Sequence, residues 1–310
     1  MIFHSISEIP YRKETAVIIN VGTKLVTTLA LLSAIKRANM PVLLVDCPYE
    51  NSLEDYNYFQ TIMDNYKFDL IQLPLKHHGE TLDNIFRNLS TDYILLIDSD
   101  LEILDNHIVF QMRKFVENNN VFGAGFRHGG FDIKKEIDYE EIRDGYYEER
   151  MWIPFTLLKT EMIKEALNVG FSFNIRTFYN IIPSNQKISR KLLYSKQIQK
   201  IAFLKNSDYL FFNFLKKEYH HKKPLVVIYD TGSDIYMHLR YGKKCFYVGI
   251  DSETGLEDEF VHHYNGITRK LMYDDPYNTG SVNAEYQSII NKLNKEYHFV
   301  YDNFIKKNIN

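Results

Sequence analysis

The chain has 310 residues, a formal net charge of −3 and an apolar fraction of 45%. This length allows one large α/β domain or two small ones, each with a hydrophobic core. The small net charge argues against a nucleic-acid-binding protein, and no apolar run is long enough to span a bilayer. Cys47 and Cys245 are too few for a disulfide framework, and Met1–Ser5 shows no secretory signal. We therefore expect a protein of the reducing cytoplasm.

The first third of the chain alternates short apolar runs with segments of helical apolar spacing. Strands that alternate with helices at this spacing predict an α/β fold with a mixed, mainly parallel sheet flanked by helices. The expected strands are Ala16–Ile19, Pro41–Asp46, Leu70–Leu73 and Tyr93–Ile97, and the expected helices are Leu25–Arg37, Leu53–Tyr66 and Thr81–Asn88.

The fourth strand ends in two carboxylates, Asp98 and Asp100, with Ser99 between them. Its unbroken apolar run is typical of a strand buried on both faces of a parallel sheet. Ligands of open α/β sheets bind beyond the carboxyl ends of the strands, and two hard oxygen ligands there suit Mg²⁺ or Mn²⁺. An Asp-x-Asp triplet arises about once by chance in such a chain, so a simple polar turn is the alternative. The place of the triplet after a buried strand favours the metal.

The middle of the chain departs from this alternation. Trp152 is more readily explained as a core aromatic than as a stacking platform for an acceptor. The segment Tyr139–Arg150 is rich in charge, so we expect it to be exposed. The other expected elements are a helix over Ile108–Glu117, a strand over Val121–Phe126, a turn at Gly129–Gly130 and a helix over Lys159–Asn168.

Two segments of the second half have helical apolar spacing. Residues 187–205 carry Lys and Arg but no acid, which is typical either of a helix on an anionic membrane surface or of a solvated helix packed on the domain. The tail Tyr286–Lys306 predicts a helix that docks on the same chain, with a homodimer seam as the alternative. Its apolar stripe is Ile289, Leu293, Tyr297, Val300 and Phe304.

Three further groups of residues accompany the carboxylate pair. Asp46 ends the second strand. Asp230–Asp234 opens a helix that runs to about Leu239, with Asp230 or Ser233 as its cap. The pair His262–His263 follows later. Together these features resemble the GT-A (Rossmann-like) fold of nucleotide-sugar-dependent glycosyltransferases, most closely glycosyltransferase family 2, over about residues 16–266.

The resemblance implies a role for each of these residues. Asp46 would contact the nucleotide base, Asp100 would be the firmer metal ligand, and Asp98 would lie nearer the ribose. The catalytic base would be Asp230, with Asp234 as the alternative. The residues expected at the nucleotide sugar are Asn20, Asp46, His78, Gly79, Asp98, Ser99 and Asp100, and those expected at the metal are Asp98, Asp100 and either His262 or His263.

The chain departs from the family pattern at two places. Cys47-Pro48-Tyr49-Glu50 replaces the usual acidic and small residues after the second strand, which leaves the nucleoside open, with a UDP-sugar favoured. Asp230 and Asp234 are separated by three residues where the family shows adjacent acids. The identity of the base therefore stays open between these two aspartates.

The chemistry of sugar transfer explains why such groups are needed together. A divalent cation stabilises the charge on a departing diphosphate, and a site of carboxylates and imidazole suits Mn²⁺ at least as well as Mg²⁺. The acceptor hydroxyl has a very high pKa, so a positioned carboxylate must take its proton. A base opposite the leaving group implies inversion at the anomeric carbon.

We therefore expect a metal-dependent, inverting glycosyltransferase that uses a nucleotide sugar and a glycan or lipid-linked acceptor to build a bacterial surface polysaccharide. It would be cytoplasmic, with peripheral contact to the inner face of the membrane through residues 187–205. The alternatives are a non-catalytic nucleotide-sugar- or glycan-binding module and a sugar-nucleotide pyrophosphorylase, for which Gly22-Thr23-Lys24 is too short a glycine-rich loop. A phosphatase is disfavoured, because its Asp-x-Asp follows the first strand.

The expected domain organisation has a catalytic domain and a tail. The catalytic domain covers residues 1–270 and consists of a nucleotide-binding half and an acceptor-binding half, the latter with a basic helical insertion. The expected boundaries are 1–104 and 105–270 for the two halves, about 185–222 for the insertion and 271–310 for the helical tail.

Overall fold

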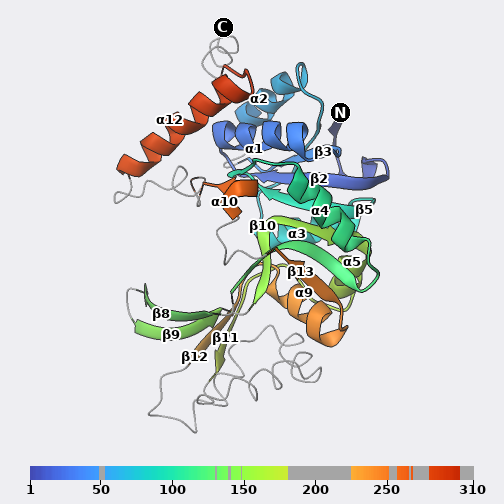
Figure 1. The fold of residues 1–310 in the computed structure, drawn as a ribbon, viewed down its shortest axis with the longest axis vertical. Helices are drawn as coiled ribbons and strands as arrows, with labels where there is room; N and C mark the ends of the chain where they lie inside the picture. The colour runs from blue at the N-terminus through green and yellow to red at the C-terminus, as the bar shows by residue number, and fades with distance from the viewer. Residues whose placement is uncertain are drawn as a thin grey trace.

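The computed structural model describes residues 1–48, 53–129, 131–138, 141–147, 149–180, 225–250, 257–264, 267 and 279–300. An eight-stranded sheet with helices on both faces forms the main body (Figure 1). The expected α/β class, with a mixed and mainly parallel sheet, is confirmed. The strands of this sheet are β1 (Ile2–Phe3), β2 (Arg12–Asn20), β3 (Val42–Asp46), β4 (Asp69–Gln72), β5 (Thr91–Asp98), β7 (Val121–His128), β10 (Arg150–Lys159) and β13 (Phe246–Gly249).

The strand order is β1-β4-β3-β2-β5-β10-β7-β13, and β10 runs antiparallel to both of its neighbours. The chain moves outward from β2 through β3 to β4, and then crosses back to place β5 on the other side of β2. The strand order therefore reverses at β2, with β3 on one side of it and β5 on the other. Such a reversal is where open α/β sheets form a ligand-binding crevice, beyond the carboxyl ends of the strands.

Helices cover both faces of this sheet. One face is covered by α1, α2, α4 and α12, and the other by α3, α5 and α9. Apolar residues of β5 alternate between the two cores, since Leu95 and Ile97 face one and Ile94 and Leu96 face the other. The strand is therefore buried on both faces, as predicted. The helices are α1 (Lys24–Arg37), α2 (Leu53–Met63), α3 (His78–Asn88), α4 (His107–Val116), α5 (Thr160–Asn168), α9 (Ser233–Met237), α10 (Glu257–Phe260) and α12 (Thr279–Glu296), with the short helical turns η1 (Ile6–Glu8) and η3 (His238–Gly242).

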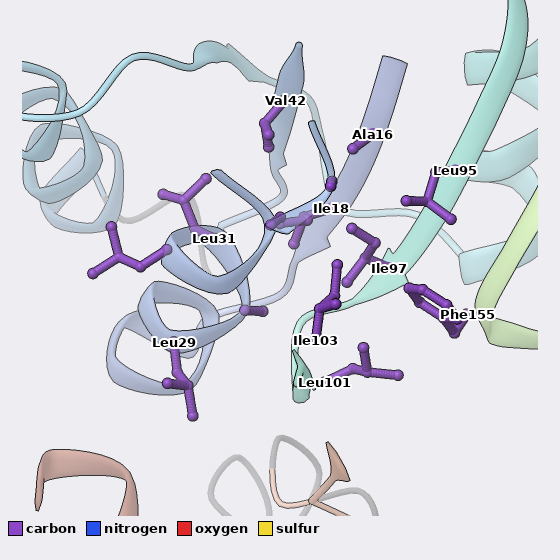
Figure 2. Packing of buried hydrophobic residues seen from close by; sticks show 14 of the residues in the cluster. Ala16, Ile18, Leu29, Leu31, Val42, Leu95, Ile97, Leu101, Ile103 and Phe155 are labelled. Carbon is purple, nitrogen blue, oxygen red and sulfur yellow. The ribbon is translucent and has the colours of Figure 1, made fainter. Parts of the chain in front are cut away.

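Figure 2 shows the core on the α1 face of the sheet. Ile18 of β2 and Ile97 of β5 lie beside each other, and the two strands pair in parallel with Ile18 opposite Ile97. Phe155 of β10 extends this packing on the far side of β5, where it is the register partner of Ile97. This core holds the ends of β2 and β5 in place.

A short two-stranded sheet continues from β5. It consists of β6 (Leu101–Ile103) and β14 (Val261–His263), which run antiparallel. Leu101 and Ile103 are buried members of the core shown in Figure 2. The segment directly after the carboxylate pair is thus a paired strand and not a free turn.

The charged middle segment contains strands that its sequence did not predict, and its expected exposure stays a prediction. Residues expected to be an exposed charged stretch contribute to a four-stranded sheet, which extends away from the main body (Figure 1). Its order is β11-β12-β9-β8, with β12 and β9 parallel. Its strands are β8 (Phe131–Asp138), β9 (Glu141–Tyr147), β11 (Arg176–Asn180) and β12 (Leu225–Tyr229).

Several predicted boundaries also need correction. Helix α3 begins at His78, three residues before the predicted Thr81, and α2 ends at Met63 and not at Tyr66. The tail helix α12 ends at Glu296. Ile289, Leu293 and Tyr297 are buried against the main core, as the docking on the same chain requires, whereas Val300 is exposed and Phe299 is buried in its place.

Some predictions concern residues that the structure does not describe. The basic segment 187–205, the rest of the insertion at about 185–222, and Phe304 lie outside the described residues. The proposed domain boundaries stay predictions. Among the described residues, none of the helices combines the length and apolar character that crossing a membrane requires.

The contact between β5 and β10 predicts a large stability effect at Phe155. Its side chain is fully buried, so Phe155→Ala should lower the free energy of unfolding by about 3–5 kcal/mol through lost burial and a cavity. Phe110→Ala, on an α4 side chain that is 62% exposed, should change it by less than about 0.5 kcal/mol. Urea denaturation of both variants checks this. Equal losses in the two would contradict the described core.

Candidate functional site

Strand register brings three of the predicted site residues to one edge of the sheet. Asn20 at the end of β2 is the register partner of Asp46 at the end of β3. Its neighbour Ile19 is the partner of Asp98 at the end of β5. Asn20, Asp46 and Asp98 therefore lie along the carboxyl edge of three adjacent parallel strands, at the position where the sheet order reverses.

Asp98, Asp100 and His263 form a cluster with the composition of a metal site. One ligand atom from each lies within 4.8 Å of the others. His263 Nε2 is 3.1 Å from Asp100 Oδ1 and 3.9 Å from Asp98 Oδ2. The Asp100 side chain is 6% exposed and that of Asp98 is 31% exposed, so the cluster opens to solvent on the Asp98 side. Ser99, between the two carboxylates, is buried.

The pairing of β14 with β6 delivers His263 to this cluster. His263 is opposite Leu101, and the Tyr264 N–H donates to the Asp100 carbonyl over 2.9 Å. Side chains of successive strand residues point to opposite faces, so His262 is turned away and packs edge-on against the ring of Tyr264. Of the two histidines left open by the sequence, the structure therefore brings His263 and not His262 to the carboxylates.

Electrostatics hold His263 in its charged form. Burial lowers the pKa of the imidazole, but Asp100 and Asp98 offset this effect and raise the pKa to about 10. For Asp98 the balance runs the other way. Burial raises its pKa, but the hydrogen bond to His263 and the charges of His78, His263 and Arg150 lower it below its ordinary value. At neutral pH an imidazolium thus lies between the two carboxylates.

Trp152 lies against this cluster. Its ring meets that of His263 edge-on at 5.2 Å between centroids, and it meets Phe126 in the same way at 5.6 Å. Trp152 is only partly buried. It therefore combines the predicted packing against the core with a direct contact to the His263 ring.

Asn20 and Asp46 are engaged in a buried hydrogen-bond network. The Asn20 amide donates from Nδ2 to Asp46 Oδ1 over 2.7 Å, and Asn20 Oδ1 accepts from Thr27 of α1 over 2.7 Å. Both Asn20 and Asp46 are fully buried. The predicted contact of Asp46 with a nucleotide base stays a prediction, and the structure gives this carboxylate a role in tying β3, β2 and α1 together. Burial, followed by the charge of Asp46, raises the pKa of the neighbouring Cys47 thiol to about 12.

His78 and Gly79 lie in the first turn of α3 and not ahead of it. The His78 side chain is exposed, and its charge contributes to the lowered pKa of Asp98. Gly79 is buried, and a Cβ there would lie 2.6 Å from backbone atoms of Asn174. Close packing of α3 against the 172–174 segment explains this glycine. Its predicted part in donor binding stays untested.

Asp230 and Asp234 differ in accessibility. The Asp230 side chain is 27% exposed, and its Oδ2 makes a 2.7 Å ion pair with Arg150. Its Oδ1 accepts the Thr231 N–H over 2.8 Å. Asp234 lies in α9 and is only 5% exposed. Of the two candidate bases, Asp230 is therefore the one that a substrate from solvent could reach.

The predicted cap of α9 is wrong. The N-cap residue is Gly232, at φ 80°, and no side chain caps the helix there. The left-handed backbone conformation at residue 232 favours glycine, and a Cβ there would also press on the side-chain end of Ile153 at 2.8 Å. This turn orients Asp230 toward Arg150 and leaves its carboxylate available for roles other than capping.

Arg150 is a site residue that the sequence did not reveal. It begins β10 and pairs across the sheet with His128 of β7. Its guanidinium binds Asp230, and its charge also lowers the pKa of Asp98, so it acts on both the candidate base and the cluster. In the sequence it is one charge among many in the segment 139–150, and no pattern there singles it out.

Comparisons with known proteins complete this description. No protein-family model and no curated protein matches the chain. Similar solved structures include the mannosyltransferase PcManGT from Pyrobaculum calidifontis in complex with GDP-Man and Mn²⁺, at 10% identity over 55% of this chain and 50% of that chain, with a TM-score of 0.38. S. aureus TarS 1-349 in complex with UDP-GlcNAc matches at 15% identity over 52% of this chain and 48% of that chain, with a TM-score of 0.35.

A third similar structure is 4-diphosphocytidyl-2C-methyl-D-erythritolsynthase from Anaerococcus prevotii, at 12% identity over 72% of this chain and 91% of that chain, with a TM-score of 0.37. The matches to PcManGT and TarS span about half the length of those chains. GT-A-type glycosyltransferases are thus among the proteins of similar structure. Membership of glycosyltransferase family 2 stays a prediction.

The residues of the cluster fit a divalent cation. Two carboxylate oxygens and an imidazole nitrogen lie within 4.8 Å of one another, and one positive charge already lies between the carboxylates in the form of protonated His263. Such a mixed oxygen and nitrogen set suits Mn²⁺ as well as Mg²⁺. A bound cation would take the place of the imidazolium proton, with Asp98, Asp100 and His263 as ligands.

This geometry predicts that Mn²⁺ binding releases protons. Because the pKa of His263 is raised to about 10, the ring is protonated at pH 7 and must lose its Nε2 proton to bind a cation. We expect about one proton released per Mn²⁺ at pH 7, and an affinity that rises up to about tenfold per pH unit between pH 6.5 and 8.5. Isothermal titration calorimetry in buffers of different ionisation enthalpy measures the release.

Two histidine variants control this measurement. His263→Gln should abolish the proton release, whereas His262→Gln should leave it unchanged, since that side chain packs on Tyr264 and faces away from the carboxylates. Equal release from His263→Gln and the unmodified protein would show that His263 is not a ligand.

Proposed function

We propose that the protein is a metal-dependent, inverting glycosyltransferase that uses a nucleotide sugar as donor. The observation that carries this proposal is the convergence of Asp98, Asp100 and His263 at the carboxyl end of β5. These groups suit a cation that binds a diphosphate, and they lie beside the point where the sheet order reverses. A cation there supplies Lewis-acid stabilisation of the charge on a departing nucleoside diphosphate.

Each protein group near this point has a task in such a transfer. Asp98 and Asp100 would hold the cation, and both carboxylates orient His263. Asp230, the accessible carboxylate, takes the proton of the acceptor hydroxyl as its oxygen forms a bond to the anomeric carbon and the bond to the diphosphate breaks. Arg150 holds one oxygen of Asp230 and the Thr231 N–H holds the other, so the carboxylate is oriented before the acceptor arrives. Attack opposite the leaving group gives inversion.

The finer aspects of the proposal rest on the sequence. We favour a UDP-sugar as donor and a glycan or lipid-linked acceptor, in the synthesis of a bacterial surface polysaccharide. The place of action would be the cytoplasm, with peripheral contact to the inner face of the membrane through residues 187–205. The division into a nucleotide-binding half (1–104) and an acceptor-binding half (105–270) belongs to the same proposal.

Two aspartate variants test the separation of roles. Asp100→Ala should remove the Mn²⁺-dependent gain in donor binding, because Asp100 is the buried ligand of the cluster. Asp230→Asn should keep donor binding and lower the rate of transfer by about 10²–10⁴-fold, because a general base is lost. Thermal shift with a panel of UDP- and GDP-sugars measures binding, and release of nucleoside diphosphate measures turnover.

Asp105→Asn provides the matched control. This carboxylate is exposed, lies just beyond β6 and accepts the His107 N–H, a contact that an asparagine side-chain oxygen can also make. Binding and turnover should both be unchanged. Undiminished transfer by Asp230→Asn would make Asp234 the base, and donor binding without any Mn²⁺-dependent turnover in the unmodified protein would favour a binding module.

A further inference from the structure

A fully buried carboxylate lies next to the cluster of Asp98, Asp100 and His263 along β6. Glu102 of β6 follows Asp100 by two residues, and its side chain is 0% exposed. Its Oε1 accepts the Tyr297 hydroxyl over 2.9 Å, and its Oε2 accepts from Tyr264 over 3.3 Å and from Lys292 Nζ over 2.5 Å. An ionised carboxylate in this environment is costly unless it is paired and hydrogen-bonded. These three donors are what keep it stable.

Two of the three donors come from the far end of the chain. Lys292 belongs to α12 and Tyr297 follows directly after that helix, 190 and 195 residues beyond Glu102 in sequence. Burial, followed by the charge of Glu102, raises the pKa of the Tyr264 and Tyr297 hydroxyls, so both remain protonated hydrogen-bond donors. Glu102 thus fastens the C-terminal helix to β6 by a salt bridge and a hydrogen bond.

The strands that meet this helix are those that carry the metal ligands. Glu102 pairs across the sheet with His262, the residue before His263. The Tyr264 N–H binds the Asp100 carbonyl, and the Tyr264 hydroxyl binds Glu102. The β6–β14 ladder has three register pairs and is not part of the eight-stranded sheet. A ladder this short depends on side-chain contacts to keep its position.

A second contact holds β6 from the side of α1. The Ile103 N–H donates to Ser33 Oγ over 3.1 Å. This bond fixes the end of β6 that is farther from Asp100, whereas Glu102 lies between Ile103 and the metal ligands. The Glu102 cluster therefore supports the part of β6 nearest to Asp100.

We propose that Lys292 and Tyr297, acting through Glu102, are positioning residues for the metal site, so that the C-terminal helix is part of the metal-binding apparatus. The inference rests on the metal site of the proposed function. Substitution of Lys292 leaves the buried Glu102 carboxylate without its positively charged partner. Strand β6 then shifts so that water can reach this carboxylate. Asp100 and His263 then lose the separation that a shared cation requires.

The test measures Mn²⁺ affinity directly, from the electron paramagnetic resonance signal of free Mn²⁺. Lys292→Met keeps much of the side-chain volume and removes the charge, and we expect it to lower the affinity about 10-fold or more. Glu102→Gln combined with Lys292→Met removes the buried charge as well and should restore affinity toward that of the unmodified protein. Lys295→Met, on an exposed lysine of the same helix, should have no effect.

Measurements on fully folded variants distinguish a positioning role of Lys292 and Tyr297 from a general contribution to stability. Affinities are measured well below the melting temperature of each variant, with circular dichroism to confirm that each is folded. Where Lys292→Met does not fold, Tyr297→Phe replaces it, since that change removes a single hydroxyl from the same carboxylate. Normal affinity in the folded single variants would overturn the inference, as would a double variant that fails to recover.

The same measurement distinguishes this inference from the proposed function. Lys292-dependent Mn²⁺ binding without sugar transfer would support the inference and overturn the glycosyltransferase proposal. Absence of Mn²⁺ binding to the unmodified protein would overturn the metal site, and the inference with it.

Discussion

Two like charges held close together at the end of a buried strand place a strong constraint on this fold. Asp98 and Asp100 cannot both remain ionised in a partly buried setting unless positive charge lies between them. The chain supplies that charge from a segment more than 160 residues away, by pairing β14 with β6 so that His263 reaches both carboxylates. The raised pKa of His263 and the lowered pKa of Asp98 both result from this interaction.

The surrounding structure keeps this charged cluster distinct from other buried carboxylates. Asp46 and Glu102 have side chains that are fully buried, and their partners are protein donors: an amide for Asp46, and a lysine and two phenols for Glu102. Asp98 is partly exposed and shares a partner with Asp100. Burial and partners therefore separate the carboxylates that join elements, Asp46 and Glu102, from the partly exposed Asp98, which shares His263 with Asp100.

Much of the architecture could be predicted from the sequence, because the alternation of apolar runs with helical spacing is a local signal. The positions of β2, β3, β4 and β5 followed from it, whereas the meeting of Asp98 with a late histidine was expected only from the resemblance to GT-A glycosyltransferases. Strands β8 and β9 could not be predicted, because their charged sequences lack a clear alternation of apolar and polar residues. The early start of α3 was missed because Gly79 is a poor helix former, and its close contact with Asn174 decides its place.

Ion pairs between segments far apart in sequence also could not be predicted. The ion pair of Lys292 with Glu102 joins segments 190 residues apart, and that of Arg150 with Asp230 joins segments 80 residues apart. A single charge in a charged segment carries no local sign of its partner. The choice of His263 over His262 depends on the register of β14 with β6, and a shift by one residue would exchange the two. Such choices are made by tertiary packing.

The charge balance of the cluster suits the proposed metal site, in which His263 would be the third ligand. The protonated His263 ring repels an incoming cation, so the proton must leave before the cation can bind at Nε2. Exchange of the imidazolium proton for a divalent cation adds two positive charges and removes one, so the site becomes more positive by a single unit. Arg150 and His78, whose charges already act on Asp98, add to the positive potential on its open side. A site that gains positive charge only when the cation arrives would bind an anionic diphosphate more strongly in the metal-bound state, which couples cation and donor binding through the protonation of one side chain.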